Sequence, residues 1–206
     1  IGAGIDVEKP DGSMIVDIGG GTTDIAVISL GGVVVRSSIK VAGDCFDESI
    51  IKYIRRNHKM MIGERTAEDL KVKIGSAFKK DVEDSMDIRG RNMITGLPQN
   101  MTITSEEMRE ALKEPVYAIA NSVHNVLEKT PPELAADISE KGIVMTGGGS
   151  LLNGLDELLH SVTKVPVRVA DDSVSCVALG TGKAFDYLDK EQVEISNSEI
   201  ELIGQR

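Results

Sequence analysis

The hydrophobic pattern of the first part of the chain is that of short strands separated by glycine turns. Met14–Ile18, Thr23–Ser29 and Val33–Val41 are rich in β-branched and other apolar residues, and Gly19-Gly20-Gly21 and Gly31-Gly32 separate them. β-branched residues favour strands, and connections this short join antiparallel neighbours. The pattern therefore predicts an antiparallel meander.

From Gly43 onwards the apolar residues recur at the spacing of a helix. Asp44 is expected to cap the first helix, whose apolar face consists of Phe46, Ile50, Ile51 and Ile54. A second helix is expected over about 66–78, with an apolar face formed by Leu70, Ile74 and Ala77. Segment 80–103 is expected to form strands on either side of a loop at Thr95-Gly96.

A capping box predicts the start of the next helix, because Thr104 is followed three residues later by Glu107. Pro115 is expected to interrupt this helix, since proline has no amide hydrogen to donate. A longer helix is expected to follow and to end before Pro131-Pro132.

Strands and helices alternate in the last third of the chain. Strands are expected over 142–146 and 165–170, and helices over 150–161 and 174–188. This alternation implies parallel pairing in an α/β layer. The acidic tail, 190–206, is expected to be disordered. A meander at the start and an α/β layer at the end indicate one domain with a smaller domain inserted into it.

Charge and composition exclude some classes of function. The 206 residues carry a net charge of −10, which argues against a nucleic-acid partner because such a partner requires a basic face. No apolar run reaches the roughly 18 residues that span a membrane. Cys45 and Cys176 are expected to be unpaired thiols in a reducing cytosol.

The first glycine turn has the composition of a phosphate site. Glycine lets backbone amides approach an anion without an intervening Cβ, and it reaches positive φ at low cost. Asp17 and Asp24 flank the turn, and Thr22 and Thr23 add hydroxyl groups. A carboxylate beside a phosphate is favourable when a divalent cation, usually Mg²⁺ with retained waters, lies between them.

The second glycine turn, Gly147-Gly148-Gly149, strengthens this interpretation. It lies between a predicted strand and a predicted helix, whose N-terminal amides and dipole attract anions. The two turns therefore suggest two sides of one nucleotide cleft. A dinucleotide-binding domain is an alternative, because GGGSLL nearly matches that fingerprint and Asp171 follows at a suitable distance, although Leu152 replaces the third glycine. GTGK at Gly180–Lys183 lacks the spacing of a P-loop.

Four stretches resemble a known family. VDIGGGTTDIAVISLGG is similar to the second phosphate motif of the actin/sugar-kinase/heat-shock-chaperone ATPase superfamily, and TGGGSLLNGLDELL resembles its adenosine motif. GERTAEDLKVKIGSA and PPELAADISEKGIVMTGGGSLL resemble the MreB/Mbl family of bacterial actin homologues. The resemblance extends over nearly the whole chain except the tail, and it covers only the second half of that family's pattern.

The resemblance implies an α/β fold of the actin-like ATPase (ribonuclease-H-like) type, with a mixed sheet and an inserted smaller α+β subdomain. Residues 1–42 and 114–189 would form the larger subdomain. Residues 43–113 would form the smaller one, which is expected to move as a separable lobe, and 190–206 would be the tail.

The resemblance also implies a site for ATP or ADP with Mg²⁺. The residues expected near the β- and γ-phosphates are Gly19, Gly20, Gly21, Thr22 and Thr23, and Asp17 would hold a water on the metal. Glu68 and Lys71 would lie at the ribose and adenine, where the residues alone would predict an exposed i,i+3 ion pair. The residues expected to cover the adenosine are Gly147, Gly148, Gly149 and Ser150. The family's first phosphate loop, a D-x-G-T-type hairpin, and its water-activating glutamate are not found, so the resemblance assigns no catalytic residue to this chain.

The function implied is that of a cytoplasmic cytoskeletal protein that polymerises with ATP into membrane-associated filaments. Such a protein would determine cell shape by positioning cell-wall synthesis, with membrane-bound cell-shape and wall-synthesis proteins as partners. The alternatives on the same fold are a chaperone-like or assembly ATPase, and half of a sugar or acetate kinase.

Overall fold

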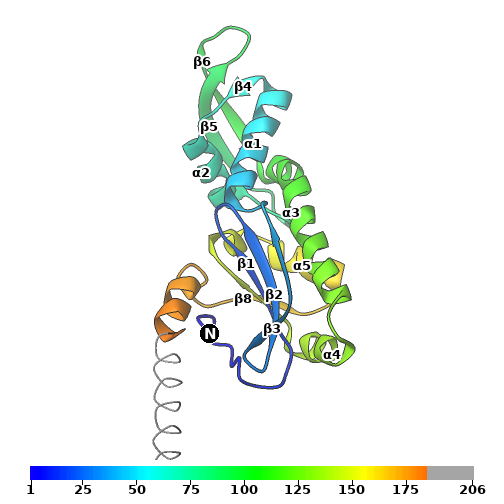
Figure 1. The fold of residues 1–206 in the computed structure, drawn as a ribbon. Coiled ribbons are helices and arrows are strands. Elements are labelled where there is room, and N and C mark those ends of the chain that lie inside the picture. Colours follow the sequence, from blue (N-terminus) through cyan, green and yellow to red (C-terminus); the bar gives the residue numbers. More distant parts are fainter. Residues whose placement is uncertain (185–206) are drawn as a thin grey trace, which may run out of the picture.

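A computed structural model describes residues 1–184, which form two lobes that each contain one sheet (Figure 1). The large lobe is built on a five-stranded sheet in the order β3-β2-β1-β7-β8. Its strands are β1 (Ser13–Ile18), β2 (Thr23–Ser29), β3 (Gly32–Ile39), β7 (Ile143–Thr146) and β8 (Val167–Val169). The small lobe has a three-stranded sheet in the order β4-β5-β6.

The five-stranded sheet is mixed. Strands β1, β2 and β3 pair antiparallel, so the predicted meander is confirmed, and Asp17 lies opposite Asp24 in the register of the first pair. Strand β7 pairs parallel with β1 on one side and with β8 on the other, which confirms the parallel layer predicted from the last third. Because β1 is the central strand, the first glycine turn, which follows β1, lies at the middle of one edge of the sheet.

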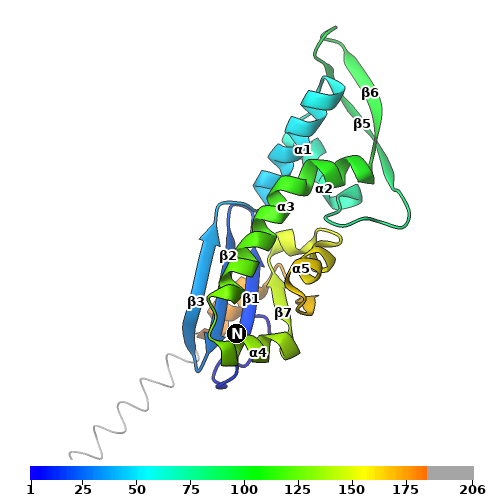
Figure 2. The same cartoon turned by 90° about the vertical axis from the view of Figure 1, so that its right-hand side faces the viewer.

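Helices cover the sheet and bury its alternating apolar residues. Met14, Val16 and Ile18 of β1 are fully buried, while the residues between them are only partly buried. Helix α3 (Ser105–Glu128) runs along β2 and β3 and also contacts α5 (Leu155–Thr163), as Figure 2 shows from the side. Helix α4 (Pro132–Lys141), which the sequence pattern did not predict, contacts β1.

The small lobe contains the elements between β3 and α3. They are α1 (Gly43–His58), β4 (Met60–Met61), α2 (Glu64–Ile74), β5 (Ser85–Asn92) and β6 (Pro98–Thr104). The expected strands on either side of residues 95–96 are confirmed, and the short β4 extends that hairpin into a sheet. Phe46, Ile50 and Ile54 of α1 are fully buried, in agreement with the helical spacing.

Two helices begin differently from expectation. Helix α1 begins at Gly43, and Asp44 does not cap it: the amides of Gly43 and Asp44 donate to the carbonyls of Gly19 and Gly20 at 3.1 and 2.9 Å. Helix α5 begins at Leu155 and not at Ser150, because Gly148–Leu151 forms a 3₁₀ turn. The first two amides of α1 are thus satisfied by carbonyls of the first glycine turn.

Two other boundaries were also wrong. Helix α2 ends at Ile74 and not near residue 78, since the next residues turn away to contact Asn153. Helix α3 continues without a break through Pro115, which is buried. Apolar residues are buried on both sides of the proline, so packing holds the helix together where one backbone hydrogen bond is lost. The capping box at the start of α3 is confirmed in both of its hydrogen bonds.

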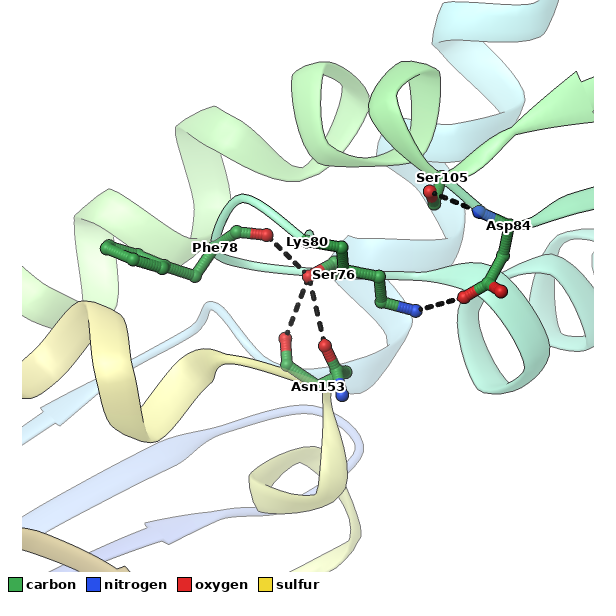
Figure 3. A network of polar contacts seen from close by, with 6 residues as sticks. All are labelled: Ser76, Phe78, Lys80, Asp84, Ser105 and Asn153. Atoms are coloured by element: carbon green, nitrogen blue, oxygen red, sulfur yellow. Dashed lines mark hydrogen bonds and ion pairs between the residues drawn. The ribbon is translucent and has the colours of Figure 1, made fainter. Parts of the chain in front are cut away.

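The two lobes share more than one connection. Helix α3 begins in the small lobe and ends on the large sheet, so the predicted subdomain boundary at residue 113 falls inside an unbroken helix. A second contact joins the segment after α2 to the turn before α5 (Figure 3): the Ser76 hydroxyl donates to the Phe78 carbonyl at 2.6 Å and lies 3.2 Å from the Asn153 side-chain oxygen. The division at residues 43 and 113 and the expected lobe movement stay predictions.

Both cysteines are free, as expected, and burial raises the pKa of the Cys176 thiol. Cys176 packs in a small apolar cluster with Val144 and Ala170. Residues 176–184 are helical, which agrees with the start of the helix expected over 174–188. The rest of that helix and the tail at 190–206 lie outside the described residues.

Candidate functional site

A large cleft lies where the two lobes meet. Its volume is about 1130 Å³, and four elements form its walls: the first glycine turn, the start of α1, the helix α2 and the second glycine turn. Gly19 and Gly20 line it from one turn, and Gly148 and Gly149 line it from the other. The structure therefore brings the two predicted turns together in one cleft.

The first glycine turn provides an open strip of backbone. A Cβ added to Gly20 would meet only the Asp44 carboxylate, at 3.5 Å, and a Cβ on Gly21 would meet no atom within 4 Å. None of these three glycines has the positive φ that we expected to explain them. Glycine in this turn therefore leaves the backbone accessible and is not required by an unusual backbone conformation.

The polar residues beside this turn have other partners. The Thr23 hydroxyl is buried and donates to the Val41 carbonyl at 2.6 Å, and the Thr22 hydroxyl donates to Asp24 at 2.9 Å. Gly21, Thr22 and Thr23 do not line the cleft. Asp17 does not line it either, and one of its oxygens accepts a hydrogen bond from the Thr146 hydroxyl at 3.0 Å.

The residues of the second glycine turn have two roles: some hold the turn in the fold, and others leave its backbone accessible from the cleft. Gly147 has a φ of 82°, and its amide donates to the Ser173 carbonyl. The Ser150 hydroxyl is buried and donates back to the Gly147 carbonyl at 2.6 Å. Neither residue lines the cleft, whereas a Cβ on Gly148 would meet no atom within 4 Å. A 3₁₀ turn, and not the expected α-helix, follows the glycines, and the anion site at this turn stays a prediction.

Glu68 and Lys71 both line the cleft from α2, but they do not form the i,i+3 pair that the residues alone suggest. The Lys71 ammonium instead donates to Asp47 on α1 at 2.8 Å and lies 3.4 Å from the Gly43 carbonyl. Side-chain exposure is 18% for Lys71 and 19% for Asp47, so this ion pair is largely removed from water. Glu68 is exposed.

Several residues of the cleft were not predicted from the sequence. Leu151 and Val72 are large apolar side chains that are exposed in it, and Arg65 lies on the same wall as Val72. Asp47 directly follows the buried Phe46. No local pattern in the sequence indicates its ion pair, because its partner Lys71 is 24 residues away on α2. Leu151 lies two residues after Gly149, and no pattern in the sequence indicated that it would be exposed.

Two features are absent from the part of the chain that the structure describes. Residues 1–184 contain no group of three or more His, Cys, Asp or Glu side chains placed to bind a metal ion directly. No helix in the same range combines the length and the apolar character needed to cross a membrane.

A mixed five-stranded sheet, with a smaller lobe inserted between its strands and a cleft where the lobes meet, defines the actin-like ATPase fold. The model of the family described as MreB/Mbl protein matches residues 1–193, and the chain therefore belongs to the MreB/Mbl family. The dinucleotide-binding alternative is excluded, because that fold requires a doubly wound parallel sheet and the large sheet of this chain is mixed.

Relatives agree with this assignment. The chain is 55% identical over 190 residues to the cell shape-determining protein Mbl of Bacillus subtilis, covering 92% of this chain and 57% of that protein. It is 52% identical over 199 residues to the cell shape-determining protein MreB of Escherichia coli, covering 97% of this chain and 57% of that protein. The chain thus spans a little over half the length of these relatives.

A solved structure supports the same fold. The crystal structure of MreB 5 of Spiroplasma citri bound to AMPPNP matches with a TM-score of 0.88 and 47% identity, over 95% of this chain and 58% of that one. The same protein has also been solved bound to ADP. The MamK double helical filament matches with a TM-score of 0.69 at 24% identity, which shows the fold alone.

Proposed function

We propose that this chain forms one side of an ATP or ADP site, with Mg²⁺, in a filament-forming protein that determines bacterial cell shape. The observation that carries the proposal is the cleft, which both glycine turns and α2 line together. The related Spiroplasma protein binds AMPPNP and ADP, and the curated relatives are cell shape-determining proteins. The chain covers only part of their length, so the other side of the cleft would come from the remainder of the protein.

The residues present fit a nucleotide. Gly20 and Gly148 leave open space where a Cβ would otherwise stand, and this lets backbone amides approach phosphate oxygens. Leu151 and Val72 offer apolar surface for a base. Polar and apolar groups in one large cleft are what a nucleoside polyphosphate requires.

The charge of the cleft favours a nucleotide that arrives with a cation. Five carboxylate side chains and only two cationic ones line it; the acidic residues are Asp44, Asp47, Glu48, Glu64 and Glu68, and the basic ones are Arg65 and Lys71. A free polyphosphate would be repelled, whereas a bound Mg²⁺ neutralises phosphate charge and polarises the phosphoryl group when present. Asp17 would hold one of its waters from the end of β1.

Glu68 provides a test of the adenosine end of this site. We expect Glu68→Ala to weaken ADP and AMPPNP binding by the same factor, on the order of fivefold to tenfold, because it would meet the nucleoside that the two ligands share. Isothermal titration calorimetry on the protein at its natural length measures both affinities. Glu110→Ala, an exposed carboxylate on α3, is the control and should bind like the parent. A parent protein that binds neither nucleotide would refute the proposed function.

We propose further that copies of the protein associate end to end. The turn between β5 and β6 lies at one end of the molecule in Figure 1, and the β2–β3 turn lies at the other, beside the segment 6–11. Exposed apolar residues occur at both ends; they are Met93, Ile94 and Leu97 at the first and Leu30 and Val33 at the second. Arg89 and Arg91 are exposed near the first end. Near the second end Lys9 pairs with Asp6, and the exposed carboxylate of Glu8 would meet an arginine in a head-to-tail contact.

A substitution at the β5–β6 turn tests this association. Ile94 is 81% exposed, so Ile94→Asp should leave the fold intact while it places a charge in the apolar contact. We expect the critical concentration for nucleotide-dependent assembly, followed by light scattering, to rise at least about tenfold. Val82→Asp, 75% exposed away from both turns, is the matched control. Unchanged assembly of the Ile94 variant would contradict the head-to-tail contact, and a peptide-stimulated ATPase without assembly would favour the chaperone-like alternative.

The cellular role is a proposal based on the relatives. We propose that the assembled protein lies at the membrane and positions cell-wall synthesis through membrane-bound cell-shape and wall-synthesis proteins. Support for this comes from the names of the Bacillus and Escherichia relatives alone.

A further inference from the structure

We infer that Asp47 is a positioning residue, which holds the Lys71 ammonium on the side of the cleft next to the first glycine turn. There the ammonium would face the phosphate and ribose part of the nucleotide, and not the base. The inference rests on the proposed nucleotide function, because Asp47 would act through Lys71 and not on the ligand directly.

The contacts of Lys71 give its direction. Both of its acceptors are on α1: Asp47 Oδ2 at 2.8 Å and the Gly43 carbonyl at 3.4 Å. The Gly43 amide donates to the Gly19 carbonyl at 3.1 Å, so one residue separates the ammonium from the first glycine turn. The side chain therefore reaches away from its own helix and toward the end of the cleft where the phosphates would lie.

The carboxylate of Asp47 has no stabilising explanation in the fold. Its Oδ1 atom is buried and has no hydrogen-bond partner among the described residues, while Oδ2 has only Lys71. A buried carboxylate oxygen without a donor destabilises a protein, and an apolar pair of similar volume is often at least as stable as a buried ion pair. What the carboxylate does provide is a fixed position for the ammonium.

Such a constraint has a clear chemical purpose. An ammonium has three donors on a flexible four-carbon chain, and two of them are directed to Asp47 and Gly43. The third can donate to an oxygen in the cleft. Without Asp47, the Lys71 side chain could turn to Glu68, the carboxylate one helical turn earlier on α2. The ammonium would then no longer lie at the end of the cleft proposed for the phosphates.

A double-mutant cycle tests the inference on the protein at its natural length. The proteins are the parent, Asp47→Asn, Lys71→Met and the double variant; calorimetry measures ADP affinity, and saturation-transfer NMR measures adenosine affinity. We expect each single variant to weaken ADP binding about tenfold and adenosine binding less than about twofold. The double variant should bind ADP no more weakly than Lys71→Met, because Asp47 acts only through Lys71. Asp69→Asn is the control, since Asp69 pairs with Lys73 outside the cleft.

Several results would overturn the inference. Asp47→Asn could bind ADP like the parent, or the two penalties could add in the double variant. A Lys71→Met variant that loses adenosine as strongly as ADP would place the ammonium at the base. If the parent binds ADP and any of these overturning results is obtained, the positioning role is wrong and the nucleotide function stands. If the parent binds neither ADP nor adenosine, the positioning role and the nucleotide function both fail. Should Asp47→Asn not fold, Asp47→Glu takes its place, and its displaced carboxylate should weaken ADP binding and spare adenosine.

Discussion

Gly147→Ala should lower the free energy of unfolding by about 3 kcal/mol or more, a large share of the roughly 5–15 kcal/mol that stabilises a domain. Gly147 has a φ of 82° and a ψ of 164°, a backbone region that is essentially confined to glycine and that costs other residues about 1–3 kcal/mol. The added Cβ would also lie 2.3 Å from the Ile18 carbonyl oxygen and 2.7 Å from an Asp17 oxygen. Ile18 ends the central strand β1, so neither the turn nor the strand can move aside without disturbing the sheet.

Gly148→Ala is the matched control for this prediction. Gly148 has no positive φ, and a Cβ added to it would meet no atom within 4 Å. We expect its unfolding free energy to stay within about 0.5 kcal/mol of the parent. Urea denaturation followed by circular dichroism compares the two variants. Equal stability of the two would mean that the close approach of this turn to β1 has no energetic consequence.

Gly20→Val should have the opposite profile, with unchanged stability and nucleotide affinity at least about tenfold weaker. Gly20 is exposed, its φ is not positive, and an added Cβ would meet only the Asp44 carboxylate, at 3.5 Å. The Cβ of a valine therefore has room in the fold. Its methyl groups would nevertheless stand in the cleft, over the backbone that is proposed to approach the phosphates. Losing two hydrogen bonds to a charged ligand, at roughly 1.5–3 kcal/mol each, accounts for the expected factor.

Gly21→Val separates this effect from a general effect of bulk in the turn. Gly21 follows directly, has open space around it and does not line the cleft. Calorimetry with ADP and AMPPNP on the protein at its natural length should give parent-like affinity for Gly21→Val. If Gly20→Val remains folded and binds MgATP as tightly as the parent, the first glycine turn is only a hairpin, and the phosphate interpretation of it is wrong.

The order of residues along the chain was sufficient to predict the class of structure. Strand and helix periods are local properties, so the meander at β1–β3, the change at Gly43 and the parallel layer that follows could all be predicted from them. The capping box at Thr104 was predictable for the same reason, because its partners are three residues apart. The glycine turns and the stretches around them are also long enough to indicate the MreB/Mbl family, which the family match confirms.

The role of each residue in the cleft depends instead on tertiary packing. Gly20 and Gly147 belong to similar triplets, yet one faces open space and the other packs against β1, because their neighbours come from distant parts of the chain. The Thr23 hydroxyl was expected near phosphate and is used inside the fold. Lys71 pairs with Asp47, 24 residues away, and not with Glu68 one turn along its own helix. Helix contacts of this kind depend on how α1 and α2 pack, and no local period or spacing contains that information.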